Sequence, residues 1–252
     1  MKNKYLVVGD FKGFFPNVTR VYPLIGYTVG FNDVYTLDDL SDGSVIIVNR
    51  LLDDVGIMEF KSLIPKIVSK CEGIIFEDLG ILELLKDEDI IKIFMPSHSI
   101  CSKYTLNEYL KYVDIAFISP DITYEEIEDI SKSVKGKIGL NVGGLLPLMY
   151  SRRKLKTNYE NYYHKKITNE ITENITKMHF IMSENEFGTV IYDKRIFDGR
   201  RLLNLGNIAY YFMNIDLINN KDEFLKAYFN NEDIGDPIFL DQKTIYKLGG
   251  DK

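Results

Sequence analysis

The chain has 252 residues, of which 45% are hydrophobic and 27% charged, and its net charge is −6. This composition is typical of a water-soluble globular protein, and the length suits one large domain, since α/β barrels of this size form single units. The acidic balance excludes a broad basic surface for nucleic acid, although residues 152–156 contain a local cluster of two arginines and two lysines.

Six short apolar runs predict buried strands, at residues 5–9, 44–48, 73–76, 91–95, 115–119 and 137–141. Unbroken apolar runs of this length are typical of parallel strands that are covered on both faces. Between them lie segments that begin with residues favoured at helix N-termini, including capping boxes at Thr105 with Glu108 and at Thr123 with Glu126. The repeated strand–helix order predicts an α/β fold, either an open wound sheet or a barrel.

The last third of the chain has a different pattern. Residues 179–193 predict two antiparallel strands joined by a turn at 185–188. Residues 205–217 contain one further candidate strand, 221–231 predict a helix, and the tail from 237 to 250 is a candidate edge strand. We find no linker rich in Gly, Pro or Ser and no internal repeat, so residues 1–252 are expected to form a single domain.

Localisation follows from what the sequence lacks. The apolar run near the N-terminus is too short for a signal peptide, and no run reaches the roughly 18 residues of a membrane span. Cys71 and Cys101 lie far apart and fit no metal-binding spacing, which is typical of reduced thiols. We therefore expect a cytoplasmic protein that does not enter a membrane.

Polar residues follow the predicted strands at the place where α/β folds bind ligands. They are Asp10, Asn49, Arg50, Glu77, Asp78, His98, Ser119 and Asn141. Neighbouring strand residues point to opposite faces, so only one of Glu77 and Asp78 enters a barrel mouth. We expect that residue to be Glu77, with Asp78 capping the next helix. His98 is a candidate acid, base or metal ligand.

Residues 144–159 carry a second candidate site. Ser151 is expected to be the N-cap of a helix whose first turn contains Arg152 and Arg153. Arginine is unfavourable at the positive end of a helix, so a carboxylate or phosphate ligand is expected there; the alternative is salt bridging to Glu77, Asp78 or Glu160. Pro147 is expected to end the sixth predicted strand.

Several segments together resemble the collagenase-like peptidase family U32, in particular its short bacterial members. The segments are LPLMYSRRKLKTNY, GIIFEDLGILELLK, IAFISPDITYEEIEDI and the closing FLDQKTIYKLGG. The resemblance implies a (β/α) TIM-like barrel, modified or incomplete. It also implies either peptidase activity or a part in the oxygen-independent hydroxylation of RNA or quinone precursors, which some members perform with an iron–sulfur cluster.

The chain departs from that family in two respects. Residues 139–144 are GLNVGG, where members with the longer signature carry Glu-x-Phe-x-His-Gly. Pro147 and Lys154 stand where cluster-binding relatives place cysteines, and two cysteines are too few for a four-cysteine cluster. No iron–sulfur cluster is therefore expected, while Ser151 and Arg153 match the family pattern.

Three functions follow as expectations. The first is a U32-type hydrolase in which Glu77 and His98 are catalytic and the substrate, a peptide or small anion, is bound by Asn141, Ser151, Arg152 and Arg153. A divalent metal held by Glu77, His98 and Glu184 would activate water in this scheme. The second is an RNA-modification enzyme or helper without a cluster. The third is a non-catalytic binding barrel.

Overall fold

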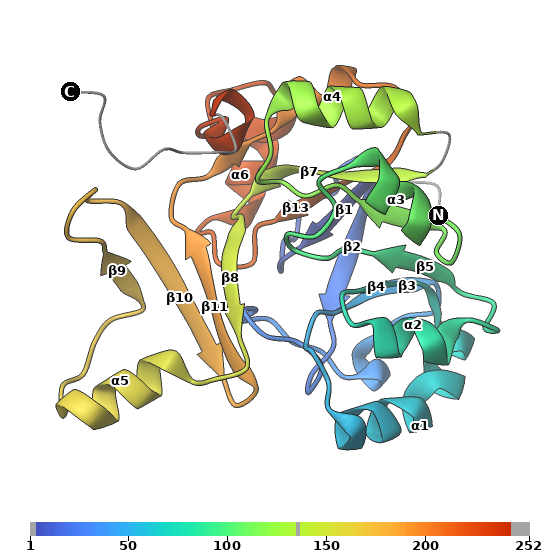
Figure 1. Ribbon diagram of the computed structural model, residues 1–252, viewed down its shortest axis with the longest axis horizontal. Coiled ribbons are helices and arrows are strands. Elements are labelled where there is room, and N and C mark those ends of the chain that lie inside the picture. The colour runs from blue at the N-terminus through green and yellow to red at the C-terminus, as the bar shows by residue number, and fades with distance from the viewer. Residues whose placement is uncertain (1–3, 135–136, 243–252) are drawn as a thin grey trace.

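The computed structural model describes residues 4–134 and 137–242, and its core is a closed barrel of eight parallel strands (Figure 1). The strands are β1 (Tyr5–Val8), β2 (Val18–Pro23), β3 (Ser44–Val48), β4 (Cys71–Phe76), β5 (Ile91–Phe94), β6 (Ile115–Phe117), β7 (Ile138–Gly144) and β13 (Ile208–Asn214). Each strand pairs with the next, and β13 closes the circle by pairing with both β7 and β1. The predicted TIM-like barrel is confirmed, with a full set of strands.

The helical layer is where this barrel departs from a regular one. Five helices cover the strands: α1 (Asp54–Lys70), α2 (Leu79–Leu85), α3 (Lys103–Tyr109), α4 (Tyr124–Ser133) and α6 (Lys221–Phe229). The described residues between β1 and β2 form no helix, and the only one between β2 and β3 is the 3-10 turn Leu37–Asp39. The expected modification of the barrel therefore lies in its helices.

Helix-start chemistry explains three of the helix boundaries. Asp78 caps α2 by accepting a hydrogen bond from the Gly80 N–H at 2.7 Å, as predicted. The Thr123–Glu126 capping box of α4 is also confirmed. The expected box at Thr105 is wrong, because α3 begins earlier: Ser102 is its N-cap and accepts from the Thr105 N–H.

The barrel interior is a packed apolar core. Alternate residues of each strand point inward, and they include Val8, Ile47, Ile75, Phe117 and Phe212, all less than 5% exposed. Gly139 on β7 belongs to the same layer. A Cβ atom there would lie 2.2 Å from the Phe117 ring, so only glycine leaves room for that ring.

A second, antiparallel sheet lies between β7 and β13 in the chain. Its strands are β8 (Pro147–Ser151), β9 (Glu170–Thr172), β10 (His179–Asn185) and β11 (Gly188–Asp193), in the spatial order β8-β11-β10-β9. Figure 1 shows this sheet beside the barrel, with α5 (Leu155–Tyr163) below it, where the helix contacts β10 and β11. The hairpin predicted over residues 179–193 is confirmed as β10 and β11.

The connection from β7 to this sheet differs from what the sequence predicts. β7 ends at Gly144, whose φ of +89° lies in the left-handed region, and a Cβ there would lie 2.0 Å from the Asn214 carbonyl oxygen. Pro147 therefore does not end the sixth predicted strand but begins β8. Ser151 ends β8 and is not a helix cap, because α5 has Lys154 as its N-cap.

The remaining elements lie near the C-terminus. β12 (Phe197–Asp198) pairs antiparallel with β7, and the predicted helix at 221–231 is α6. Of the expected edge strand at 237–250, residues 238–241 form a 3-10 helix, and residues 243–250 lie outside the described part of the chain. None of the helices in the described ranges has both the length and the apolar character of a membrane span.

Candidate functional site

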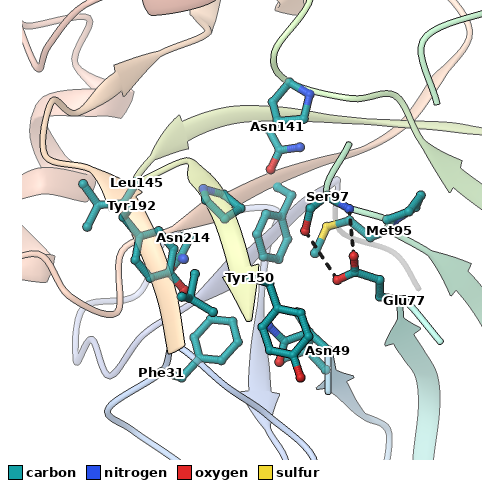
Figure 2. Close-up of a pocket in the computed structure, with 16 residues that line it drawn as sticks. Phe31, Asn49, Glu77, Met95, Ser97, Asn141, Leu145, Tyr150, Tyr192 and Asn214 are labelled. Carbon is teal, nitrogen blue, oxygen red and sulfur yellow. Dashed lines mark hydrogen bonds between the residues drawn. The ribbon is translucent and has the colours of Figure 1, made fainter. Parts of the chain in front are cut away.

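A cavity of about 50 Å³ lies at the carboxyl ends of the barrel strands, between the barrel and the antiparallel sheet. Figure 2 shows its walls. The apolar lining is Phe31, Ile47, Met95, Leu145, Val190 and Phe212 together with three prolines, and the polar lining is Asn49, Glu77, Ser97, Asn141, Tyr150, Tyr192 and Asn214. This is where parallel barrels bind their ligands.

Strand alternation explains which polar residues reach the cavity. Glu77 follows β4 at the inward position two residues after Ile75, and Asn49 stands in the same relation to Ile47. Asn141 on β7 follows Gly139 in the same way. The expected inward position of Glu77 is confirmed, since it lines the cavity while Asp78 caps α2.

Glu77 is the acidic group of the cavity. Its carboxylate accepts hydrogen bonds from the Ser97 N–H at 3.3 Å and the Ser97 hydroxyl at 3.4 Å (Figure 2). Burial raises the pKa of Glu77 above its usual value, and these two hydrogen bonds oppose the rise only in part. A carboxyl group with a raised pKa beside a cavity is suited to exchanging protons with a ligand.

Two other polar groups of the cavity have free hydrogen-bonding capacity within the described residues. The Asn141 amide points toward the middle of the cavity in Figure 2, and its atoms make no side-chain hydrogen bond there. The Tyr150 hydroxyl on β8 is fully buried: the Leu51 main chain lies beside its oxygen without a hydrogen bond of normal geometry, and its O–H has no acceptor. A buried polar atom without a partner costs free energy, so both groups are available to a ligand or to water.

The side chains of the other two lining asparagines already make hydrogen bonds within the protein. Asn49 bonds to the main chain of Val29, accepting from its N–H at 2.9 Å and donating to its carbonyl at 3.0 Å. The Asn214 side-chain oxygen accepts from the Asp216 N–H. These amides therefore fix the loops that form the cavity wall, and less of their hydrogen-bonding capacity is free.

His98 does not line the cavity. Its Nδ1 lies 3.2 Å from the Asp121 carboxylate, and this hydrogen bond is the main reason why the pKa of His98 is raised. The Leu148 main chain and the charge of Glu77 raise it further. The structure places His98 at the rim, where it links the loop after β5 to β8, and its role as acid, base or metal ligand stays a prediction.

Glu184 is far from the metal site suggested by the sequence. Its carboxylate accepts from the Lys156 N–H at 2.7 Å and the Thr157 N–H at 3.1 Å, and so it caps the first turn of α5. The Thr157 and Thr189 hydroxyls donate to it as well. Among the described residues, no group of three or more His, Cys, Asp or Glu side chains is placed to hold a metal ion.

Replacing Glu184 with alanine should loosen α5. The change leaves the Lys156 and Thr157 N–H groups without their acceptor, and we expect the free energy of unfolding to fall by about 1–2 kcal/mol. Urea unfolding measures this, with Glu186→Ala as control because Glu186 is exposed on the β10–β11 turn. An equal loss in both variants would contradict the capping role.

Ser151, Arg152 and Arg153 also lie outside the cavity lining. Arg152 pairs with Asp53 at 3.2 Å, and both side chains are half exposed. The Arg153 N–H donates to the Ser151 hydroxyl. None of the three expected acidic partners is used, since Glu160 pairs with Lys166. Arg152 therefore lies near the start of α1, and neither arginine lines the mouth of the barrel.

Sequence reasoning missed four polar lining residues: Ser97, Tyr150, Tyr192 and Asn214. Asn214 ends β13 at the inward position two residues after Phe212, so the alternation rule finds it once that strand is assigned. The two tyrosines come from β8 and β11. No local pattern in the sequence shows that these strands fold over the barrel.

Asp216 holds one wall of the cavity through the loop that carries Phe31. Its carboxylate accepts from the Asn32 N–H at 2.6 Å and the Asp33 N–H at 3.2 Å. Burial, with the charge of Asp33, raises the pKa of Asp216 to about 6, although these hydrogen bonds and Lys221 act in the opposite direction. The folded chain therefore holds this proton more tightly than the unfolded chain does.

Stability should therefore fall as pH rises through the pKa of Asp216. The stabilisation by the proton is complete below the ordinary pKa of 3.8 and is lost as pH passes about 6, a change of up to about 3 kcal/mol. Asp216→Asn cannot titrate. We therefore expect the free energy of unfolding of this variant, relative to that of the parent, to rise by up to about 3 kcal/mol between about pH 4 and pH 8, as measured by urea unfolding. A constant difference between the two proteins would contradict this assignment.

The fold and cavity define the class of protein: a TIM-type barrel with a ligand-sized cavity at the carboxyl ends of its strands. Comparisons of the chain with protein-family models, curated proteins and solved structures gave no match. Similarity to the U32 peptidases therefore rests on the sequence segments quoted above and is carried forward as a proposal.

Proposed function

We propose that the protein is a hydrolase of the U32 peptidase type whose active site is the cavity at the barrel mouth. The observation that carries the proposal is Glu77, a partly buried carboxyl group with a raised pKa that borders a largely apolar cavity. General bases in enzymes are commonly carboxylates of this kind, held near the pH at which they work. The U32-like sequence segments support the same reaction class.

In this proposal Glu77 moves the proton and water is the nucleophile. The oxygen of a water molecule bonds to the carbonyl carbon of an amide, and the proton it loses passes to the Glu77 carboxylate. Glu77 then gives that proton to the leaving nitrogen as the carbon–nitrogen bond breaks. The products are a carboxylic acid and an amine or ammonia.

Two groups with free hydrogen-bonding capacity bind the substrate in this scheme. The Asn141 amide donates to the carbonyl oxygen, where negative charge develops as water adds. The Tyr150 O–H donates to a second polar atom. Neither the Asn141 amide nor the Tyr150 O–H has a partner of normal hydrogen-bond geometry among the described residues. His98, the second expected catalytic residue, acts from the rim by holding the Ser97 loop against β8.

A hydrolysis assay tests the proposal. The purified chain is incubated with small carboxamides and with short peptides, with and without added divalent metal, and released ammonia and new amino groups are measured. We expect turnover of at least one amide, and none after Glu77→Gln. If every substrate stays intact in all conditions, the hydrolase proposal is wrong.

A non-catalytic binding barrel is the second candidate, and one observation favours it. Of the expected catalytic pair, only Glu77 lines the cavity; of the two arginines, neither lines it, and Arg152 pairs with Asp53. Saturable ligand binding without turnover would support this function over that of a hydrolase. The RNA-modification alternative has the sequence resemblance as its support, and unchanged nucleoside masses in RNA from a deletion strain would remove it.

A further inference from the structure

We propose that the part of the substrate that enters the cavity is a small, electrically neutral carboxamide with a short apolar group. The inference rests on the proposed function, since it concerns the same cavity, and it specifies the substrate class. Three properties of the cavity carry it: the charge of its walls, the hydrogen-bonding groups that are free, and its size.

Charge excludes an acidic ligand. Among the described residues that line the cavity, Glu77 is the acid, and none is a lysine, arginine or histidine. A carboxylate in this space would lie beside the Glu77 carboxylate, and the cavity lining holds no cationic side chain to bind it directly. The nearest arginines are held elsewhere: Arg50 donates to the Gly26 carbonyl and stacks on Phe187, and Arg152 pairs with Asp53.

A cationic ligand conflicts with the chemistry. An ammonium group would pair with Glu77 and hold that carboxylate in its ionised form, so that it could not take a proton from water. A neutral group leaves Glu77 free to exchange a proton. Much of the remaining lining is aromatic or aliphatic, with Phe31, Phe212 and Val190 among its residues, and it suits an uncharged ligand.

The free hydrogen-bonding groups match a carboxamide. Such a ligand offers one carbonyl acceptor and an N–H₂ donor. The cavity offers a donor at the Asn141 amide, a hydroxyl at Tyr150 and an acceptor at Glu77, none of which is fully used. Figure 2 shows Asn141 and Glu77 on different walls, so a carboxamide between them can use its two ends at once.

The volume limits the ligand to a few atoms. About 50 Å³ is the space of roughly three or four water molecules. Acetamide has the same shape as acetate and as acetamidinium, while the three differ only in charge and in hydrogen-bonding pattern. They therefore separate the effect of charge from the effect of size.

Methionine-methyl NMR measures the binding directly. Met95 lines the cavity, so its ¹³C-labelled methyl group reports on ligand entry whether or not a reaction follows. Each of the three compounds is titrated into the full chain. We expect a saturable shift of the Met95 signal with acetamide, at least tenfold weaker binding of acetate, and at least tenfold weaker binding of acetamidinium.

Two variants locate the site. Tyr150→Phe removes one hydroxyl that makes no hydrogen bond of normal geometry, so it should fold as the parent does and bind acetamide several-fold more weakly. Asn141→Leu should weaken binding at least tenfold, with Asn158→Leu as control because Asn158 is exposed on α5. Parental affinity in the Asn141 variant would overturn the proposed contacts.

The outcomes separate this inference from the hydrolase proposal. Binding of acetamide without turnover of any amide would contradict the hydrolase proposal and support the inference of a neutral ligand. Turnover of peptides would support the hydrolase proposal. If acetate or acetamidinium then bound as tightly as acetamide or more tightly, the inference of a neutral ligand would be wrong. Absence of any Met95 shift with acetamide also overturns the inference.

Discussion

Glu77→Gln should lower kcat/KM for amide hydrolysis by about 100- to 10,000-fold, the range over which general acid–base catalysis contributes. Glutamine keeps the shape of the side chain. Its oxygen can still accept from the Ser97 N–H, and its N–H₂ group can donate to the Ser97 hydroxyl oxygen, but it cannot take a proton from water. Because an ionised carboxyl group is costly to bury, the variant should be at least as stable as the parent near neutral pH.

The control for this variant is Glu59→Gln, which neutralises an exposed carboxylate on α1. It should leave the rate unchanged. In the parent, kcat/KM should rise with pH through a midpoint above the ordinary glutamate pKa of 4.5, because burial raises the pKa of Glu77 and the base must be ionised. A glutamine variant that retains a third or more of the parental rate would exclude Glu77 as the base.

The second large effect is expected at Gly139, inside the barrel. Gly139→Ala places a methyl group 2.2 Å from the Phe117 ring, which is 1% exposed and packs edge-on against Phe212 at 6.1 Å. The ring cannot move without disturbing the layer below the cavity. We expect the free energy of unfolding to fall by about 1–3 kcal/mol or more.

A double-mutant cycle tests the cause of this loss. Phe117→Leu alone leaves a void and should destabilise the barrel, but in combination with Gly139→Ala it makes room for the new methyl group. The double variant should therefore be more stable than the sum of the single losses predicts. Gly206→Ala is the control, since no atom lies within 4 Å of a Cβ at that position. Strict additivity would show that the two residues do not compete for space.

Much of the barrel is predictable from the sequence because buried parallel strands are apolar throughout. β3 has five buried residues in succession, and a run of this kind is visible without any structure. β2 was missed because its sequence, VTRVYP, alternates with polar residues. The physical reason is the absence of a helix between β1 and β2 in the described chain, so that Arg20 is only partly covered and pairs with Asp10.

The candidate site was predictable only on its barrel side. Strand alternation places Glu77, Asn49 and Asn141 at the mouth, since each follows an inward-facing residue at a spacing of two. The sequence does not reveal the opposite wall, because Tyr150 and Tyr192 reach the cavity through the packing of a separate sheet. The partner of Arg152 could not be predicted for the same reason. Asp53 is 99 residues away in the sequence, and no local pattern connects the two residues.

The position of β13 in the chain has a consequence for folding. Tyr5 in β1 pairs with Tyr211 in β13, so the barrel closes only when two strands that are far apart in the sequence meet. Contacts between residues so far apart slow folding, because the intervening chain must be ordered first. A nascent chain that stops before β13 exposes the edges of β1 and β7, and open strand edges pair readily with other chains. We therefore expect truncation before residue 208 to yield aggregates.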